Sequence, residues 1–492
     1  MKPSVILYNP MSSPSRKKIL PMSLLALGAV LEGRHEYSIL DGNDTPNPLG
    51  AIRERVRQGA NVIAVTVMPG PQLAQAWPVC RELKREFPGL IIVWGGYFPT
   101  LHASACLNSP EIDYVVQGHG EAVFPELMDL IASGGDPAGL QGLACRREKG
   151  AACANPPAPL PDPRLLPAFP YDRIDISRYV RSTFLGSRTL PHHSSYGCPF
   201  ACNFCAVAAV SQARWLAQTA EQVAGIAGYY RKRWQVNAIE FHDNNFFVQE
   251  GRVAEFADRI LRFGMAWWGE GRVDTLSGFS ESTWRLMAQS GLKMVFMGAE
   301  TSSLQTLHLM GKGGTLAPES TLEICARARR HGIVPEFSFV IGNPPDPDAD
   351  VEAAFQFIRR LKKINPACEI ILYTYAPVPL EGGMLRAASA YGFAFPDTLE
   401  EWASPRWREF AARRSAGVPW FSERLKRRVR NFERVLNACY PTSTRPGPGA
   451  VARALLRGAG FWRYYSGIHA FPLELRVLQR CFHYRRPETT GF

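Results

Sequence analysis

The sequence has no long apolar run. None of its hydrophobic stretches reaches the roughly 18 to 20 residues that a membrane-spanning helix needs. The first ten residues, MKPSVILYNP, hold one lysine, a strand-like run and then Asn and Pro, without the small-residue cleavage site of a signal peptide. No internal repeat is visible. These absences argue against a membrane-spanning or exported chain and favour a cytoplasmic protein.

Most of the cysteines stand alone in the sequence. Because a cytosolic chain keeps its thiols reduced, we expect the isolated cysteines to be small buried side chains rather than disulfide partners. Of the 11 cysteines, the isolated ones are Cys80, Cys106, Cys145, Cys153, Cys325, Cys368, Cys439 and Cys481. The other three fall together in the stretch CPFACNFC, which sets that stretch apart from the rest of the chain.

Residues 1–400 taken together have no excess of either charge, and the positive excess is confined to the C-terminal end. The net charge is +12, and residues 401–492 hold 18 Lys or Arg against 6 Asp or Glu, which accounts for all of it. Such a region could contact nucleic acid, an anionic membrane surface or an acidic substrate, or it could be a solvated helical face. The same region carries Trp402, Trp407, Trp420, Trp462, Tyr464 and Tyr465.

A chain of 492 residues is too long for one ordinary core, so we expect two or three domains. Residues 1–135 alternate apolar strand patterns such as NVIAVTVM with helix patterns such as PQLAQAWPVCRELKREF. This alternation predicts an α/β fold in which a doubly wound, Rossmann-like parallel sheet is covered on both faces.

This first domain lacks the G-x-G-x-x-G fingerprint after its first strand, so an ordinary dinucleotide site is not expected. Glycines instead end the fourth and fifth predicted strands, LIIVWGG and IDYVVQG. Doubly wound sheets bind ligands at that carboxyl edge. The glycines that predict a ligand site there are Gly95, Gly96, Gly118 and Gly120.

Three further regions follow the first domain. Residues 136–189 include NPPAPLPDPRLLPAFP, which has too many prolines for a regular element and predicts a linker. Residues 190–385 again alternate strand and helix patterns, which predicts a full or partial barrel of parallel strands. Residues 386–492 have a mainly helical pattern that STRPGPGA interrupts, which predicts a helical C-terminal region.

The cysteine stretch has the spacing C-x3-C-x2-C, formed by Cys198, Cys202 and Cys205. Three thiolates on one loop cannot complete a tetrahedral zinc site, and no fourth Cys or His follows at zinc-finger spacing. A cubane iron–sulfur cluster needs only three cysteines if its fourth iron stays open for a substrate atom. The spacing favours this cluster, with zinc or a structural role as the alternatives.

CPFACNFC resembles the cluster loop of the radical S-adenosylmethionine superfamily. The resemblance implies a 4Fe-4S cluster whose open iron binds S-adenosylmethionine, which is cleaved to a 5′-deoxyadenosyl radical. It also implies that Phe204 lies near the adenine and that FHDNNF places Asp243 and Asn244 near the methionyl group. The strand ends GEGR and MGAE would bring Arg272 and Glu300 to the carboxylate, amino group or ribose.

A doubly wound domain in front of such a barrel resembles the cobalamin-dependent subclass. The resemblance implies cobalamin at the carboxyl edge of the first sheet, near Met68, Gly95, Gly96 and Gly118. The D-x-H-x-x-G signature, whose His ligates cobalt, is absent because the chain has DGNDTPNPLG at that point. We therefore expect base-off binding without a protein His. His102 and His119 could be axial groups, although a helix-start or loop role is favoured for both.

With these cofactors, the resemblance implies methylation of an unactivated carbon in a small-molecule substrate. The alternative is cyclisation or another rearrangement, as in the anaerobic Mg-protoporphyrin monomethyl ester cyclase family. An external electron donor of the flavodoxin or ferredoxin type is expected. A nucleic-acid substrate is not, because residues 401–492 have a helical pattern where related RNA-modifying enzymes append a small β-barrel. Peripheral membrane contact through the C-terminal region remains open.

Overall fold

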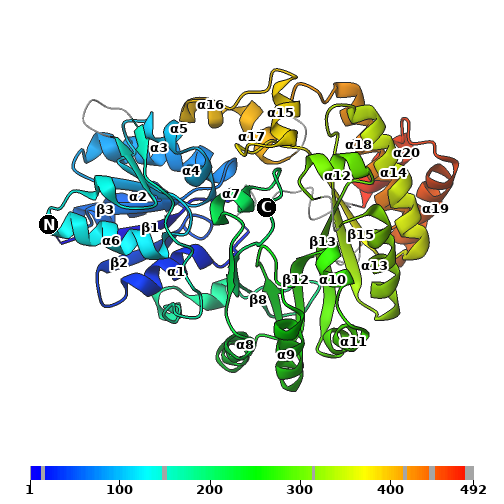
Figure 1. Cartoon of the computed structure of the whole chain (residues 1–492), viewed down its shortest axis with the longest axis horizontal. Coiled ribbons are helices and arrows are strands. Elements are labelled where there is room, and N and C mark those ends of the chain that lie inside the picture. The colour runs from blue at the N-terminus through cyan, green and yellow to red at the C-terminus, as the bar shows by residue number, and fades with distance from the viewer. Residues whose placement is uncertain are drawn as a thin grey trace.

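The computed structural model has two α/β units and a helical C-terminal region (Figure 1). It describes residues 2–12, 17–146, 152–312, 316–413, 418–442 and 449–482. In these ranges, no helix is long and apolar enough to cross a membrane.

The first unit is a seven-stranded sheet in the order β2-β1-β3-β4-β5-β6-β7, of which the first five strands are parallel. Its central strands form because their apolar runs are buried on both faces. The order reverses between β1 and β3, which is the point where doubly wound sheets bind ligands. The strands are β1 (Ser4–Asn9), β2 (Glu36–Asp41), β3 (Val62–Thr66), β4 (Ile91–Gly95), β5 (Tyr114–Val116), β6 (Leu143–Arg146) and β7 (Ala152–Ala154).

Six helices connect these strands and cover the sheet. The second, α2, has a clear start signal, because the side chain of Asn47 caps it and Pro48 occupies its first turn. The helices are α1 (Met22–Leu31), α2 (Pro48–Arg57), α3 (Pro71–Glu86), α4 (Tyr97–Leu101), α5 (Ala103–Leu107) and α6 (Gly120–Ser133). The two short helices α4 and α5 were not indicated by the sequence pattern.

The segment expected to be a linker contributes two strands to the first sheet. β6 and β7 pair antiparallel beyond β5, and the sequence pattern did not indicate them. Farther along, two single 3-10 turns at Tyr171–Arg173 and Ile176–Tyr179 lead toward the barrel. The hydroxyl of Tyr179 donates to the carboxylate of Asp41 at 3.0 Å, which ties this segment to the end of β2.

The second unit is an open barrel of six parallel strands in the order β8-β11-β12-β13-β14-β15. A small antiparallel pair, β9 (Ser195–Gly197) with β10 (Trp215–Ala217), flanks its first strand. The barrel strands are β8 (Thr189–His192), β11 (Ala238–Phe241), β12 (Ala266–Arg272), β13 (Leu292–Glu300), β14 (Val334–Ile341) and β15 (Glu369–Thr374).

Helices alternate with the barrel strands and cover their outer face. α8 begins with a capping box between Thr219 and Gln222, and α14 begins at the Asp346 cap with Pro347 in its first turn. The helices are α7 (Ala206–Ser211), α8 (Ala220–Trp234), α9 (Glu250–Ile260), α10 (Val273–Ser277), α11 (Glu281–Gln289), α12 (Leu304–Leu309), α13 (Pro318–Arg330) and α14 (Pro347–Ile364).

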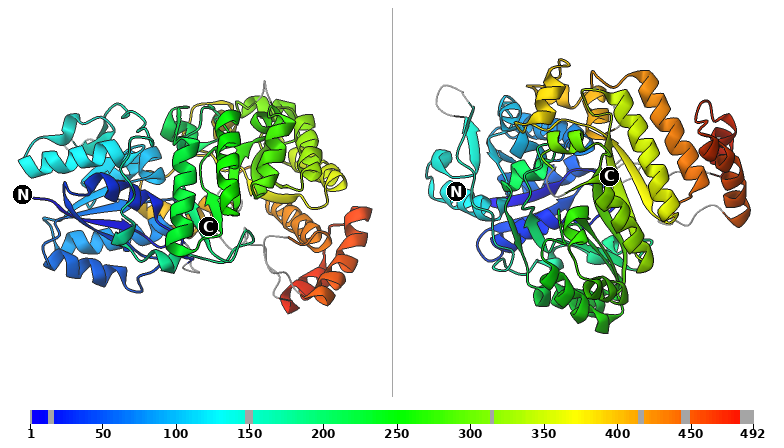
Figure 2. Two further views of the ribbon diagram at one scale, coloured as in Figure 1. Left: turned by 90° about the horizontal axis from the view of Figure 1, so that it is seen from below. Right: turned by 45° about the vertical axis from the view of Figure 1, so that its right-hand side comes forward.

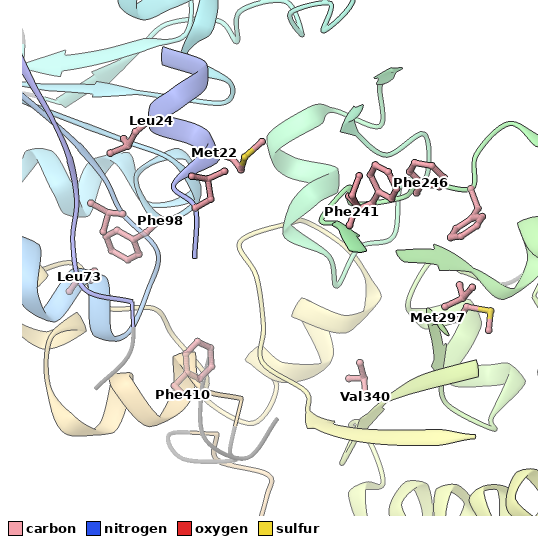
Figure 3. Close-up of a cluster of buried hydrophobic side chains, with 14 of the residues drawn as sticks. Met22, Leu24, Leu73, Phe98, Phe241, Phe246, Met297, Val340 and Phe410 are labelled. Atoms are coloured by element: carbon pink, nitrogen blue, oxygen red, sulfur yellow. The ribbon is translucent and has the colours of Figure 1, made fainter. Parts of the chain in front are cut away.

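Side chains that point outward from the barrel strands form its hydrophobic core with these helices. Phe241 and Trp267 are fully buried, and the rings of Phe241 and Phe246 stack with centroids 4.5 Å apart. Figure 3 shows Phe241 and Phe246 side by side in the barrel unit, apart from Met22, Leu24 and Phe98 of the first unit. The alternate residues of each strand face the barrel interior.

The C-terminal region divides into two parts. The first part (α15–α17) lies over the gap between the two units, whereas the second (α18–α20) packs on the far side of the barrel (Figures 1 and 2). The rings of Phe355 on α14 and Phe432 on α18 stack at 3.7 Å. The helices are α15 (Gly383–Ser389), α16 (Leu399–Trp402), α17 (Pro405–Ala411), α18 (Glu423–Cys439), α19 (Ala450–Ser466) and α20 (Leu473–Cys481).

The fold class predicted from the sequence is confirmed. The first unit is a doubly wound α/β sheet, the second is a partial barrel of parallel strands, and the C-terminal region is helical. The exact division of the chain at residues 135, 189 and 385 stays a prediction.

Candidate active site

The three clustered cysteines lie on one loop between β9 and α7, beside the carboxyl ends of the barrel strands. Gly197 precedes them with φ +74°, and a Cβ atom there would lie 2.2 Å from the carbonyl oxygen of Arg214. Only glycine fits this approach between the β9–β10 pair. Asn203 fixes the middle of the loop, since its side chain donates to the Leu309 carbonyl at 2.7 Å.

Donors from two barrel strand ends reach the cysteine sulfurs. Arg272, at the end of β12, donates from Nη1 to Sγ of Cys202 at 3.1 Å. The amide nitrogen of Asn245 lies 3.9 Å from Sγ of Cys198. Burial raises the pKa of the Cys198 thiol and of the Cys205 thiol, and the neighbouring cysteines raise both pKa values further. These thiols therefore need a bound cation or cluster to be held as thiolates.

The donor set fits a cubane cluster better than a single ion. In the described ranges, no three His, Cys, Asp or Glu side chains are arranged to hold a metal ion. A cubane binds each cysteine at a different iron, so its ligands need not converge on one point. Three neighbouring thiols on one loop, with N–H donors directed at two of the sulfurs, meet this requirement.

Arg272 is itself held firmly. It pairs with Asp274 through Nη2 at 2.6 Å, and its guanidinium carbon lies 3.7 Å from the ring centroid of Phe200 within the cysteine loop. This arrangement leaves the guanidinium facing the loop.

The acidic residues singled out by the sequence are already engaged within the chain. Asp243 is buried and accepts hydrogen bonds from the backbone and hydroxyl of Ser194 and from the hydroxyl of Ser195. Glu300, at φ +60°, forms a buried ion pair with Lys312 at 2.5 Å. Their expected contacts with S-adenosylmethionine stay predictions.

A cavity of about 320 Å³ separates the cysteine loop from the carboxyl edge of the first sheet. The four glycines predicted at this edge line it: Gly95, Gly96, Gly118 and Gly120. Asn244, after β11, and Val207, on α7 directly behind Cys205, line the opposite side. The structure thus brings the four glycines named from the sequence, and Asn244, to one cavity.

Two other predicted residues do not line this cavity. Met68 is 46% exposed, and its backbone N–H donates to the side chain of Gln72. Phe204 is partly buried and packs against the hydrophobic core.

The two histidines considered as axial groups differ in position. His102 joins α4 to α5 beneath Trp402, with ring centroids 4.6 Å apart, and burial lowers its pKa to about 4. His119 precedes α6 and lines the cavity, where it stacks on Tyr196 at 4.5 Å. Burial also lowers the pKa of His119. Both occupy helix-start positions.

Several cavity and loop residues were missed by sequence reasoning. Asn245, the last polar residue of HDNNF, contacts Cys198. The sequence signal for it was that it directly follows Asp243 and Asn244, which had already been chosen. His193 and Tyr196, which line the cavity, precede the cysteines in PHHSSYGCP. Tyr97 and Arg413 carried no local signal, since they meet only in the folded chain.

Arg413 joins all three regions. Arg413 follows α17, and its guanidinium carbon lies 5.5 Å from the ring centroid of Tyr373 on β15. Burial raises the pKa of Tyr97 and of Cys205, and the charge of Arg413 lowers both pKa values in part. The C-terminal region therefore reaches the surroundings of the cysteine loop.

Comparison with known families agrees with this layout. Residues 14–128 match the B12 binding domain, and residues 193–358 match the radical SAM superfamily. A Pyrococcus horikoshii protein named as an uncharacterized methyltransferase is 26% identical over 370 residues, covering 73% of this chain and 78% of its own. The anaerobic magnesium-protoporphyrin IX monomethyl ester cyclase of Synechocystis is also 26% identical, covering 71% of this chain and 68% of its own.

The fold also resembles a solved structure. The radical S-adenosylmethionine methyltransferase TsrM from Kitasatospora setae, with cobalamin and a [4Fe-4S] cluster bound, superposes with a TM-score of 0.63 at 20% identity. The match covers 80% of this chain and 76% of that one. At this identity, the likeness concerns the fold.

Proposed function

We propose that this chain, which belongs to the cobalamin-dependent radical S-adenosylmethionine enzymes, methylates an unactivated carbon of a small-molecule substrate. The observation that carries the proposal is the single cavity between the two units. Its walls are the glycine-lined edge of the B12-binding domain and helix α7, which begins directly after Cys205. A methyl carrier and a radical source held there would face the same space.

The cofactors supply the reactive chemistry: a 4Fe-4S cluster with S-adenosylmethionine would supply the radical, and cobalamin would supply the methyl group. Cys198, Cys202 and Cys205 would hold the cluster. Arg272 and Asn245 direct N–H groups at the sulfurs and favour their thiolate forms. Gly95, Gly96 and Gly118 leave room for a large planar ring at the sheet edge.

Cluster binding is tested by changing the three cysteines together to Ala. The variant should lose its iron and sulfide after anaerobic reconstitution and should no longer cleave S-adenosylmethionine. Cys481→Ala is the matched control, because Cys481 is an exposed, isolated cysteine. Unchanged iron content in the triple variant would refute the assignment.

Methyl transfer is tested with S-adenosylmethionine that carries a trideuterated methyl group. The reconstituted enzyme is incubated with cobalamin, a reductant and a metabolite extract, and we expect a product that has gained the labelled methyl group, together with S-adenosylhomocysteine. A product formed with 5′-deoxyadenosine but without label would instead support cyclisation. That second candidate rests on the likeness to the Synechocystis cyclase.

We further propose an external one-electron donor of the flavodoxin or ferredoxin type, and we expect no nucleic-acid substrate. Turnover with a purified flavodoxin system in place of dithionite tests the donor. A salt-dependent shift of RNA in a native gel would contradict the second expectation.

The outer helices α19 and α20 are proposed to contact an anionic membrane surface. Phe461, Trp462 and Tyr465 are exposed on α19, and exposed arginines accompany them on both helices. Interfacial aromatics beside positive charge favour anionic lipid, at about 1 kcal/mol per Lys or Arg near the surface. Figure 2 shows these helices at the outer edge of the molecule.

Sedimentation with phosphatidylcholine vesicles, with and without phosphatidylserine, tests this contact at low and high salt. We expect binding only to the anionic vesicles at low salt, and its loss in a Phe461→Ser, Trp462→Ser variant. Tyr229→Ser, which alters an exposed aromatic side chain on α8, is the control. Failure of the wild type to sediment at low salt would refute the proposal.

A further inference from the structure

The barrel interior carries one glutamate on each of five successive strands. Because outward residues such as Phe241, Trp267 and Val295 are buried against the helices, the alternate side chains face inward. Cross-strand register places several of them at neighbouring levels. The inward glutamates are Glu240, Glu270, Glu300, Glu336 and Glu369.

Four of these carboxylates have partners within the chain. Glu240 pairs with Arg181, and Glu300 pairs with Lys312. The hydroxyl of Thr442 donates to Glu369 at 3.2 Å, and Glu336 also has a partner. A buried charge is costly unless it is paired, so these partners explain how the interior tolerates so many acids.

Glu270 is the exception in the described part of the chain, where its side chain has no hydrogen bond or ion pair. Burial raises the pKa of Glu270 to about 7, and the charge of Asp243 adds to that effect while His242 opposes it. The nearby His193 does not supply a compensating cation, because burial lowers its pKa to about 4. The carboxyl of Glu270 thus forms no ion pair in the described residues, and His242 only partly offsets its burial.

The surroundings of Glu270 are open and aromatic. Trp268, Glu270 and Phe296 all keep part of their surface exposed, although Trp267, Val295 and Met297 beside them on the same strands are fully buried. The inner face at this level is therefore not filled by protein. Aromatic faces next to a carboxylate are suited to a cation.

Neighbouring side chains link Glu270 both to the cysteine loop and to the cavity. Arg272, two residues after Glu270 on the same face of β12, contacts Cys202, so Glu270 is about 7 Å along the strand from that contact. The ring of His242 lies 5.8 Å from Trp268 and stacks on His193 at 6.1 Å. His193 lines the cavity, and so these rings connect it to Glu270.

We propose that Glu270 binds a protonated nitrogen of the substrate, with Trp268 and Phe296 holding the adjoining apolar part. The substrate is then a cationic amine or related base rather than an anion. This inference rests on the proposed function for the identity of the site as the substrate site. The interaction itself does not depend on turnover.

The probe is benzylamine, with benzyl alcohol as its uncharged counterpart and benzoate as its anionic one. Binding to the full-length, cluster-reconstituted protein is measured by saturation-transfer NMR and calorimetry. We expect benzylamine to bind the wild type about tenfold or more tightly than benzyl alcohol, as befits a charged hydrogen bond. Glu270→Gln should remove this preference.

Glu369→Gln is the matched control, since that glutamate already accepts from Thr442, and it should keep the preference for the amine. Equal binding of the amine and the alcohol to the wild type would overturn the proposal. A Glu270→Gln variant that keeps its preference for the amine would also overturn the proposal. The same holds for a Glu270→Gln variant that no longer binds S-adenosylmethionine in equilibrium dialysis. Amine binding without methyl transfer would refute only the proposed function, which keeps the two failures distinct.

Discussion

The guanidinium of Arg272 donates a hydrogen bond to the sulfur of Cys202 across 3.1 Å, and Asp274 holds it in place. One strand end of the barrel is thereby linked to the loop that carries all three candidate cluster ligands. Arg272 thereby places positive charge beside the three candidate ligands.

Replacing Arg272 by Met should make the cluster harder to reduce. The reduced cluster carries the more negative charge, so loss of the nearby cation shifts its potential downward. Loss of a charge-assisted hydrogen bond, worth about 1.5 to 3 kcal/mol, should also speed the release of iron. An EPR-monitored redox titration and iron analysis measure both effects.

Arg272→Lys should restore part of the potential because it restores the charge. Arg188→Met is the control, since Arg188 bonds to the Trp234 carbonyl away from the cysteine loop. An unchanged potential in Arg272→Met would contradict the role given to this residue.

Gly95→Leu should weaken cobalamin binding by about tenfold, the effect of crowding a cavity that the ligand must fill. Its Cβ position is unstrained, with the nearest heavy atom, the carbonyl oxygen of Val116, at 3.6 Å. Equilibrium dialysis with hydroxocobalamin measures the change. Gly225→Leu, on a helix position with open space around it, should bind like the wild type. Equal affinities in all three proteins would remove Gly95 from the cobalamin site.

Glu270 should make the folded protein less stable as the pH rises. Its pKa is raised from 4.5 to about 7 on folding, so the folded state holds more protons than the unfolded state between these values. Stability therefore falls as the pH rises through this window, by on the order of 1 to 3 kcal/mol.

Glu270→Gln should remove that loss. Its melting temperature should exceed that of the wild type at pH 8 and should match it near pH 4.5, as measured by calorimetry. Glu369→Gln should show no such gain at pH 8. A Glu270→Gln variant that is less stable than the wild type at pH 8 would contradict the unpaired state of this carboxyl.

Trp402→Ala should loosen the C-terminal cover from the first domain. The indole packs edge-on against Phe98 at 5.1 Å and against His102 at 4.6 Å. Loss of a buried Trp costs about 3 to 5 kcal/mol. Hydrogen exchange should rise in α4, α5 and α16, while the iron content stays at the wild-type value. Leu304→Ala, which alters an exposed side chain, is the control, and equal exchange in both variants would exclude the docking role.

The features predicted from the sequence are those that local pattern determines. The strands VILYN and NVIAVTVM and the cysteine spacing are short-range signals, and they led to the doubly wound sheet, the partial barrel and the family. β6 and β7 were missed because they are short, lie among prolines and are stabilised by pairing with β5 rather than by their own pattern.

Site residues were harder to predict because their roles depend on distant partners. The HDNNF stretch pointed to a strand end that lies beside the cysteine loop, where Asn245 contacts Cys198. The sequence could not show that the carboxylate of Asp243 instead accepts hydrogen bonds from Ser194 and Ser195. Likewise, Glu240 and Glu270 look alike in sequence, and only the fold shows that Arg181 pairs with the first.

The contact between Phe98 and Trp402 also orders events during synthesis. Trp402 lies in the last fifth of the chain, so the ribosome delivers it long after the first sheet, whose last strand ends at Ala154, has been made. Contacts between residues so far apart in sequence form late in folding. The face of the first domain on which Trp402 packs is thus still uncovered on the nascent protein, and a ligand as bulky as a corrin can reach that domain before α16 docks on it.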